Sequence, residues 1–415
     1  MKEMSGGSDI FACMYPDLSY LAHALLGTEP DNWLAVFKTF GFFLAISFLV
    51  SAALYYVELR RKAREGVFRP VRVKVEEGKP PSLIEVSSNA LLGLIVGGKG
   101  FYAAQHIEEF QVDPAAVIFS SKMHWPAALV GAVLLGGLMG WERWRKRKQV
   151  PIAVEKDIWP HDRISDITVW AAVGGIVGAK VFDLFDNWAA FLNDPAGALL
   201  SGGGLAFYGG LVLGFIAVVV YLYRHRIPFL PAADAVAPAL AAGYGVGRIG
   251  CQLSGDGDWG IVNQLPKPEW LRWLPDGWWA STYPHHVLNT PYTDPVSSVP
   301  IEGCTWRYCM ELSMPVFPTP LYETLMMAVI FAVLWALRRR LQTPGMLFFL
   351  YLTLAAVERF WIEKIRVNVH HEVFGFRMSQ AEIISSLLFA VGLVGMLTVW
   401  LLHRRYSNRM ASVQS

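Results

Sequence analysis

The chain has few charged residues and few cysteines for its length. Charged residues make up 17% of the 415 positions, against about 25% in typical soluble proteins. Four cysteines exclude a disulfide-dense scaffold. The formal net charge of +2 gives no basic excess, so we expect no nucleic-acid partner. Hydrophobic residues reach 54%, which excludes a disordered chain and indicates a polytopic membrane protein.

The hydrophobic residues fall in segments long enough to cross a bilayer, which takes about 20 apolar residues. We therefore expect an all-α, polytopic membrane protein with about nine transmembrane helices. The predicted spans are 33–57, 85–105, 125–141, 166–186, 204–223, 231–250, 321–337, 345–364 and 380–402. The longest connection is a large outer-face loop between the sixth and seventh spans.

Lysine and arginine concentrate in alternate connections between these spans. Segment 58–79 carries eight of them and segment 142–148 carries five. Because short basic connections stay in the cytoplasm, nine spans place the N-terminus outside and the C-terminus in the cytoplasm. The loop 251–320, with only three basic residues, then lies on the outer face.

This outer loop contains six tryptophans. They suit either a lid in the lipid headgroup zone or a compact cap with an ordinary aromatic core, and both readings stay open. Cys304 and Cys309 also lie in the loop, which would face an oxidising compartment. A disulfide between them and a pair of free thiols are the two alternatives.

An internal repeat links two parts of the chain. Residues 96–120 align without gaps on 177–201, with nine of 25 positions identical. Two helices and an outer loop are therefore expected twice in the same orientation. The expected organisation is an outer N-terminal segment (1–32), a first span (33–57), the extra repeat pair (85–148), core spans (166–250), the outer loop or lid (251–320), three C-terminal spans (321–402) and a cytoplasmic tail (403–415).

Several charged residues fall within or at the outer ends of predicted spans, where each needs a partner or a function. Arg359, Glu363 and Arg366 are spaced to share one helix face. Arg248 ends a different span at the same outer boundary. Two arginines from different helices can clamp a phosphate through paired hydrogen bonds, whereas a self-neutralising ion pair would only tie helices together.

Glycines recur beside these charges in segments 201–210 and 243–250. Glycine lets a neighbouring backbone or a lipid headgroup approach closely. Tight helix packing and a headgroup cradle are both compatible with this pattern, and the adjacent charges favour the cradle.

At these motifs the sequence resembles the prolipoprotein diacylglyceryl transferases, from about residue 166 to 402. GRIGCQLSGDGDWG (247–260) is similar to the family signature G-R-x-G-N-F-x-N-G-E-x-x-G. SGGGLAFYGG (201–210) resembles the segment S-F-H-G-G, PTPLYE (318–323) resembles H-P-S-Q-L-Y-E, and ERFWIEKIR (358–366) resembles R-F-x-x-E-x-x-R.

The chain departs from these motifs at several functional positions. Cys251 and Ser254 stand where the family has asparagine. The signature glutamate is Asp256, or Asp258 if the extra residue is placed differently. Tyr208 replaces the histidine that is often given the role of base.

The resemblance implies transfer of a diacylglyceryl group from phosphatidylglycerol to the lipobox cysteine thiol of exported prolipoproteins, in the bacterial inner membrane. The partners would be phosphatidylglycerol, prolipoprotein signal peptides and membrane lipids. No cofactor or metal is expected. The expected catalytic residues are Tyr208, Arg248, Arg359 and His285. The expected substrate-binding residues are Arg248, Gly247, Gly250, Cys251, Ser254, Asp256, Gly209, Gly210, Tyr322, Glu323, Glu363 and Arg366.

The sequence does not identify the base that takes the thiol proton. Either Tyr208 only hydrogen-bonds the headgroup while His285, His286 or an aspartate takes the proton, or the arginine field lowers the pKa of the thiol directly. Two other classes are also compatible with the sequence. They are a secondary transporter with parallel repeats and a non-catalytic lipid-binding membrane protein.

Overall fold

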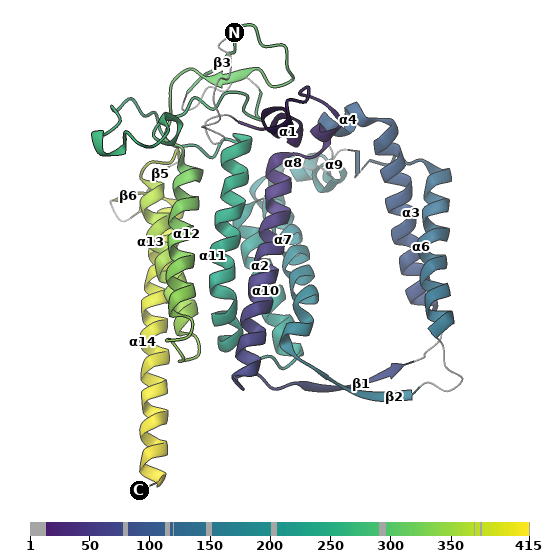
Figure 1. Cartoon of the computed structure of the whole chain (residues 1–415), viewed down its shortest axis with the longest axis vertical. Helices are drawn as coiled ribbons and strands as arrows, with labels where there is room; N and C mark the ends of the chain where they lie inside the picture. Colours follow the sequence, from purple (N-terminus) through teal and green to yellow (C-terminus); the bar gives the residue numbers. More distant parts are fainter. Residues whose placement is uncertain are drawn as a thin grey trace. The chain divides into compact units, whose positions relative to one another are not determined.

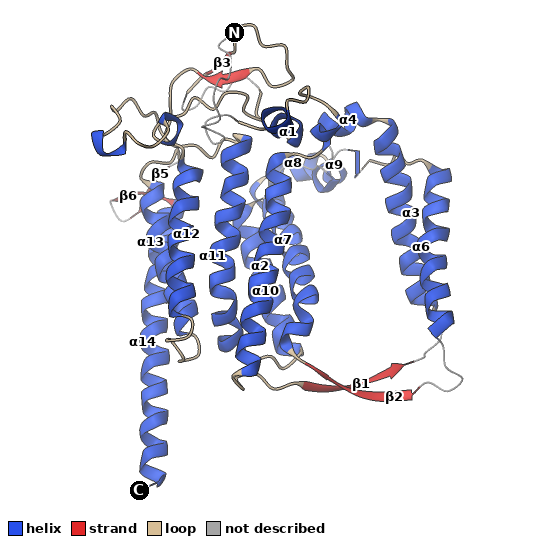
Figure 2. Cartoon of the chain, viewed as in Figure 1, coloured by secondary structure: helices blue, strands red, loops and turns tan. Residues whose placement is uncertain are grey.

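Long helices occupy the positions that the hydrophobic segments predict (Figures 1 and 2). The computed structural model describes residues 14–77, 82–112, 117–118, 120–146, 152–200, 206–289, 296–368, 370–373 and 376–414. The chain divides into two units, the first made of Met1–Val67 with Pro228–Ser415 and the second of Phe68–Ile227. The DPA of the first repeat copy and residues 201–205 of the glycine-rich segment lie outside the described residues.

The first unit is built from long helices and an outer loop. Its helices are α1 (Leu18–Leu26), α2 (Thr39–Arg64), α11 (Phe229–Ser254), α12 (Thr319–Leu337), α13 (Met346–Glu363) and α14 (Gln380–Gln414). Its short elements are η1 (Trp33–Val36), η3 (Glu269–Leu271), η4 (Asp276–Trp278), β3 (Ser298–Pro300), β4 (Met310–Leu312), β5 (His370–Val373) and β6 (Phe376–Ser379). The pairs β3–β4 and β5–β6 are antiparallel.

The second unit contains two helix hairpins and a β-ribbon. Its elements are β1 (Val71–Glu77), α3 (Leu83–Gln105), α4 (Ile107–Val112), α6 (Trp125–Lys146), β2 (Ile152–Ile158), η2 (Pro160–Arg163), α7 (Ile164–Asp186), α8 (Trp188–Asn193), α9 (Pro195–Leu200) and α10 (Phe207–Arg224). Strand β1 pairs antiparallel with β2, from Val71 opposite Ile158 to Glu77 opposite Ile152. The strand before the α3–α6 hairpin is thus paired with the strand that follows it.

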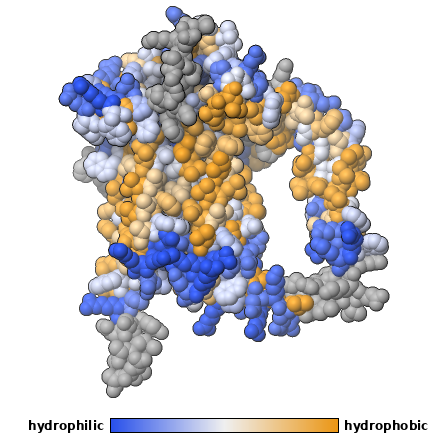
Figure 3. All heavy atoms as spheres, viewed as in Figure 1, coloured by the Kyte–Doolittle hydropathy of each residue, from blue (hydrophilic) through white to orange (hydrophobic). Residues whose placement is uncertain are grey.

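Six of the described helices are long and apolar enough to cross a membrane. They are Thr39–Arg64, Trp125–Lys146, Pro160–Asp186, Phe229–Ser254, Thr319–Leu337 and Gln380–Arg405. The remaining predicted spans coincide with α3, α10 and α13, so the chain is helical there too. Figure 3 shows hydrophobic side chains along the helices and hydrophilic ones toward their ends. The chain is a polytopic helical membrane protein.

The two copies of the repeat form equivalent hairpins. In the first, the amide of His124 donates to the carbonyl of Gly98 at 3.2 Å, and in the second the amide of Ala206 donates to Ala179 at 3.0 Å. Gly98 and Ala179 are aligned positions of the repeat, whereas His124 and Ala206 are offset by one further residue. The duplication is therefore structural, with a one-residue difference in the connecting segment.

Small residues bring α2 and α11 close together in the first unit. A Cβ on Gly243 would collide with the Ser51 side chain, and one on Gly250 would lie 2.8 Å from the Cβ of Phe43. The hydroxyl of Ser47 donates to the carbonyl of Gly243 at 2.7 Å. Gly250 therefore packs against α2, and its expected place in a headgroup cradle stays a prediction.

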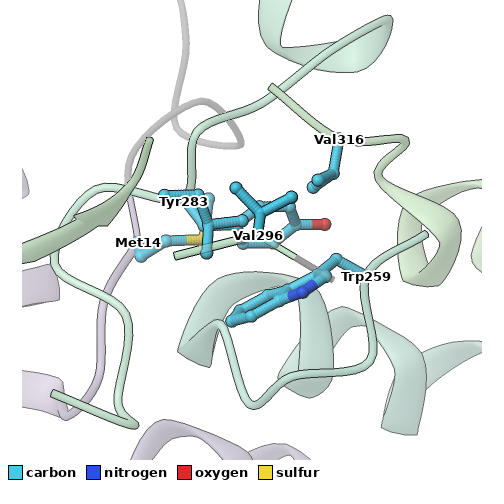
Figure 4. Packing of buried hydrophobic residues seen from close by; sticks show 6 residues of the cluster. Met14, Trp259, Tyr283, Val296 and Val316 are labelled. Atoms are coloured by element: carbon cyan, nitrogen blue, oxygen red, sulfur yellow. The ribbon is translucent and has the colours of Figure 1, made fainter. Parts of the chain in front are cut away.

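The outer loop has a hydrophobic core of its own. Trp259 and Tyr283 pack with Met14 and other buried side chains (Figure 4). Trp270 and Trp273 differ, since they are 75% and 77% exposed. Trp259 thus belongs to a compact core of the loop, while a place of Trp270 and Trp273 in the lipid headgroup zone stays a prediction. Cys304 and Cys309 form a disulfide.

The disulfide segment holds the loop onto the N-terminal segment. The amide of Arg307 donates to Asp31 at 2.9 Å, and the amide of Tyr308 donates to the hydroxyl of Tyr20 at 3.2 Å. The Tyr308 hydroxyl in turn accepts from Lys38 at 3.0 Å. The loop is consequently anchored to α1 and to the start of α2.

Candidate functional site

The site begins where α11 ends. Gly255 terminates the helix because it adopts a left-handed conformation (φ 60°), and its amide donates to the carbonyl of Cys251 at 3.0 Å. A residue with a side chain rarely adopts this conformation. The turn sends the chain from Arg248 in the last turns of α11 back over the helix end, which places Asp256 and Asp258 near that arginine.

Gly260 fixes the other end of the signature segment. It forms an antiparallel bridge with Arg366, and its amide donates to the carbonyl of Phe317 at 2.8 Å. A Cβ at this position would collide with the carbonyl of Ile365. Three distant segments therefore meet at Gly260 because it has no side chain.

Glu323, in the first turns of α12, is the centre of the cluster. Its side chain is fully buried and lies 2.8 Å from the Nε of Arg248. The Nη1 of Arg359 is 3.2 Å away and the Nη1 of Arg366 is 3.4 Å away. One carboxylate thus gathers three arginines from three different segments.

Asp258 and Glu363 complete the ion pairs. Asp258 contacts both Arg248 and Arg366, and Glu363 lies 2.7 Å from the Nη2 of Arg359. The three guanidinium groups thus face three carboxylates. Of these carboxylates, Asp258 is 30% exposed while Glu323 is 0% exposed, so Asp258 is the partner that an incoming anion can replace most easily.

Arg366 corrects one expectation from the sequence. Its spacing from Arg359 predicts a shared helix face, but α13 ends at Glu363. Arg366 lies beyond the helix end, in the bridge with Gly260. That bridge, and not helical periodicity, directs its side chain to Asp258 and Glu323.

Glu363 is held by more than its arginine. The side chains of Asn368 and Ser379 both donate to its Oε1 at 2.5 Å. Arg359 therefore has a rigid counter-ion four residues away on its own helix, as the spacing predicted.

Asp256 lies beside the paired arginines rather than among them. Its Oδ1 accepts from the amide of Asp258 at 3.3 Å, and it hydrogen-bonds with the thiol of Cys251. Ligand-type atoms of these three residues lie within 4.8 Å of one another. Asp258 is already paired with the positively charged Arg248 and Arg366. The group of Cys251, Asp256 and Asp258 is therefore poorly suited to bind a metal cation.

The two aspartates differ in their acidity. Burial raises the pKa of Asp256 above its usual range, and the charge of Asp258 raises it further. Burial acts in the same direction on Asp258, but Arg248 and Arg366 outweigh it and hold the pKa of that carboxyl below its usual value. Two neighbouring carboxylates thus have opposite tendencies, a pattern typical of acid–base sites.

The loop histidines are packed into the loop instead of facing the arginines. His285 hydrogen-bonds the carbonyl of Tyr308 at 2.5 Å, and its ring lies 4.8 Å from that of Trp306. His286 is fully buried and pairs with the hydroxyl of Ser298 at 3.1 Å. These contacts favour a structural role for His285 over the expected role as base.

Several expected binding residues have packing roles. Gly209 and Gly210 face α7, because a Cβ on Gly209 would collide with the carbonyl of Gly178, and one on Gly210 would lie 2.9 Å from that of Gly175. Ser254 is buried and bonds its own helix through the carbonyl of Cys251. These are packing contacts, and a role of the three residues in substrate binding stays a prediction.

The remaining expected residues lie nearer to the cluster or in the other unit. Tyr322 precedes Glu323, and its hydroxyl donates to the carbonyl of Trp279 at 3.4 Å. Gly247 has more room than Gly250, since the nearest atom to a Cβ there is 3.9 Å away. Tyr208 lies in α10 of the second unit, and its place at the headgroup stays a prediction.

Tyr244 belongs to the site and was missed by the sequence analysis. Its hydroxyl donates to Glu323 at 3.3 Å, and its ring lies 5.1 Å from the guanidinium carbon of Arg248. The available signal was its spacing, because it precedes Arg248 by four residues on the same helix.

Comparison with known proteins identifies the family of the chain. The family model described as prolipoprotein diacylglyceryl transferase matches residues 115–398. The chain belongs to this family. The match begins within the extra repeat pair, earlier than the expected 166, and includes all three arginines of the cluster.

Individual members of the prolipoprotein diacylglyceryl transferase family show the same relationship. The phosphatidylglycerol–prolipoprotein diacylglyceryl transferase of Corynebacterium efficiens is 30% identical over 236 residues, covering 56% of this chain and 66% of the relative. The transferase of Dehalococcoides mccartyi is 26% identical over 285 residues, covering 68% of this chain and 92% of the relative. That of Nitratidesulfovibrio vulgaris is 28% identical over 301 residues, covering 71% of this chain and 94% of the relative.

Proposed function

We propose that the protein transfers the diacylglyceryl group of phosphatidylglycerol to the lipobox cysteine of exported prolipoproteins. The observation that carries this function is the convergence of Arg248, Arg359 and Arg366 on the single buried carboxylate of Glu323. Planar guanidinium groups suit a phosphodiester, which they can bind through two hydrogen bonds each.

The arginines act on the leaving group. When the thiol sulfur attacks the glycerol carbon, the bond from that carbon to the phosphate oxygen breaks and glycerol phosphate leaves with the electron pair. Negative charge on the phosphate oxygens then increases, so cations held in place stabilise the transition state more than the bound lipid. Glu323 and Glu363 keep Arg248 and Arg359 in position for this step.

For the lipid phosphate to bind the arginines, it has to replace a carboxylate that is paired with them. Asp258 forms ion pairs with Arg248 and Arg366, and it is the most exposed of the three paired carboxylates. An entering lipid phosphate would displace Asp258 and leave Glu323 and Glu363 in place. The cluster then keeps a positive surface for the headgroup without a large rearrangement of its buried part.

The proposed topology follows from the basic connections. Nine spans in the bacterial inner membrane would place the N-terminus outside, the C-terminus in the cytoplasm and the tryptophan-rich loop over the outer end of the site. The exposed Trp270 and Trp273 suit the lipid headgroup region, and the signal peptide of the preprotein would approach from the same side.

A direct assay tests the function. The purified full chain, in vesicles containing phosphatidylglycerol, is incubated with a synthetic lipobox peptide. Mass spectrometry should show the mass of one diacylglyceryl group on the cysteine and release of glycerol phosphate. A peptide with serine in place of that cysteine is the matched control. Lack of transfer to the cysteine peptide would contradict the proposal.

A further inference from the structure

Among the described carboxylates of the signature segment (247–260), Asp256 is the one that forms no ion pair with an arginine. Its described partners are the amide of Asp258 and the thiol of Cys251. Arg248 is close by, with its Nη1 on Asp258 and 3.7 Å from the sulfur of Cys251. A carboxylate thus lies next to the arginines while it keeps its capacity to accept a proton.

The environment of Asp256 already accommodates a thiol. Cys251, on the last turns of α11, is buried and hydrogen-bonds this carboxylate. Its sulfur lies near both an acceptor and a guanidinium group, which are the two groups that a substrate thiol needs. A carboxylate can take a proton from a thiol and an arginine can stabilise the charge that results.

We propose that Asp256 is the general base that takes the proton from the lipobox thiol. This inference rests on the proposed transferase function. It assigns the role of base, which the family's histidine would have at position 208, to a different residue. The thiol proton passes to the Asp256 carboxylate as the sulfur–carbon bond forms and the carbon–oxygen bond to phosphate breaks. Asp256 then returns the proton to the released phosphate or to water.

The charged groups around Asp256 agree with this role. They are Asp258 and Arg248 from the signature segment and α11, Cys251 from α11, and Tyr283 from the outer loop. Burial and the charge of Asp258 raise the pKa of Asp256, which makes it a stronger base than an ordinary carboxylate. Displacement of Asp258 by the lipid would keep one negative charge near Asp256, now on the phosphate.

The pH dependence of the rate distinguishes a base from a structural residue. With a general base, the wild-type rate levels off once Asp256 is ionised, so the rise in the pH profile belongs to the carboxylate and not to the thiol, whose unperturbed pKa is about 8.5. Without a base, only the ionised thiol reacts, so the rate of both wild type and Asp256→Asn rises tenfold per pH unit up to the pKa of the thiol, which is about 8.5 when unperturbed and lower if the arginines lower it.

The experiment compares wild type, Asp256→Asn and Asp256→Glu from pH 5.5 to 8.5, with the full chain in phosphatidylglycerol vesicles. Asp276→Asn is the matched control, because Asp276 is 97% exposed in the outer loop. At pH 6.5 we expect Asp256→Asn to be at least about 100-fold slower than wild type, with the gap narrowing as pH rises. Asp256→Glu should recover the plateau at a lower rate.

The possible results distinguish the role of Asp256 from the proposed transferase function. A constant ratio between Asp256→Asn and wild type at every pH, or an unaffected rate, would overturn the role of Asp256 while leaving the transferase function in place. A wild-type rate that rises tenfold per unit to pH 8.5 would overturn it without any variant, even if Asp256→Asn fails to fold. No transfer by wild type at any pH would instead overturn the proposed function itself.

Discussion

The Nε of Arg248 lies 2.8 Å from the Oε2 of Glu323, and this pair joins the end of α11 to the start of α12. Neither helix would bring its charged residue to the other through local sequence alone. The pair is buried on the Glu323 side, and Glu323 also binds Arg359 and Arg366. Buried charges of this kind need complete pairing, so the cluster is sensitive to the loss of any member.

Removal of a clamping arginine should abolish transfer. We expect Arg248→Ala and Arg359→Ala to lose lipid modification of a reporter preprotein, because the leaving phosphate loses its cation. Lysine at either position should not restore full activity, since a single ammonium lacks the planar fork. Arg272→Ala is the control, as Arg272 is 73% exposed and pairs with Glu269. Normal labelling in either alanine variant would rule out the clamp.

Neutralising Glu323 should destabilise the protein. Glu323→Gln keeps the shape but leaves three arginines without their shared counter-ion, and loss of one partner from a buried ion pair costs about 3–5 kcal/mol. Thermal unfolding of the purified protein should show a lower Tm, and transfer should be slower. The exposed Glu302 supplies the control Glu302→Gln. An unchanged Tm in Glu323→Gln would mean that the arginines do not depend on this carboxylate.

The outer loop should lose stability at acidic pH through His286. Burial, with a smaller effect of His285, lowers the pKa of His286 to about 4, whereas an exposed histidine has a pKa of about 6.5. Between these values the unfolded loop binds a proton that the folded loop does not, so stability falls as pH falls from 6.5 to 4. Proteolysis of the loop should accelerate over this range. His286→Gln should remove that part of the pH dependence, and an identical pH response in the variant would contradict the prediction.

Tyr208 should be dispensable as a proton acceptor. We expect Tyr208→Phe to retain appreciable transfer activity, because Asp256 is the proposed base and the tyrosine hydroxyl would then only hydrogen-bond the headgroup. Tyr208→His restores the residue of the resembling motif, and equal or faster turnover would show that the position still faces the thiol. Loss of all activity in Tyr208→Phe, with normal expression, would assign the hydroxyl an essential role.

The sequence alone determined the helical architecture and the family motifs. A backbone in lipid must satisfy its hydrogen bonds internally, so the long apolar segments predicted helices, and α11, α12 and α14 lie where they were predicted. The first span was predicted at 33–57, whereas α2 covers Thr39–Arg64 and Trp33–Val36 forms a separate 3-10 helix. The repeat was visible in aligned residues such as Lys99 and Lys180. Arg248 and Arg359 were evident because charges near the membrane need a partner.

Only the tertiary structure decided which charges meet and which glycines pack. Arg366 reaches Asp258 through its bridge with Gly260, a contact between segments about a hundred residues apart that no helical period encodes. The packing contact of Gly250 depends on the helix opposite, and the contacts of His285 depend on Tyr308 and Trp306 of the outer loop. Local periodicity specifies each element, but close approach, burial and ion pairing depend on neighbours that are distant in sequence.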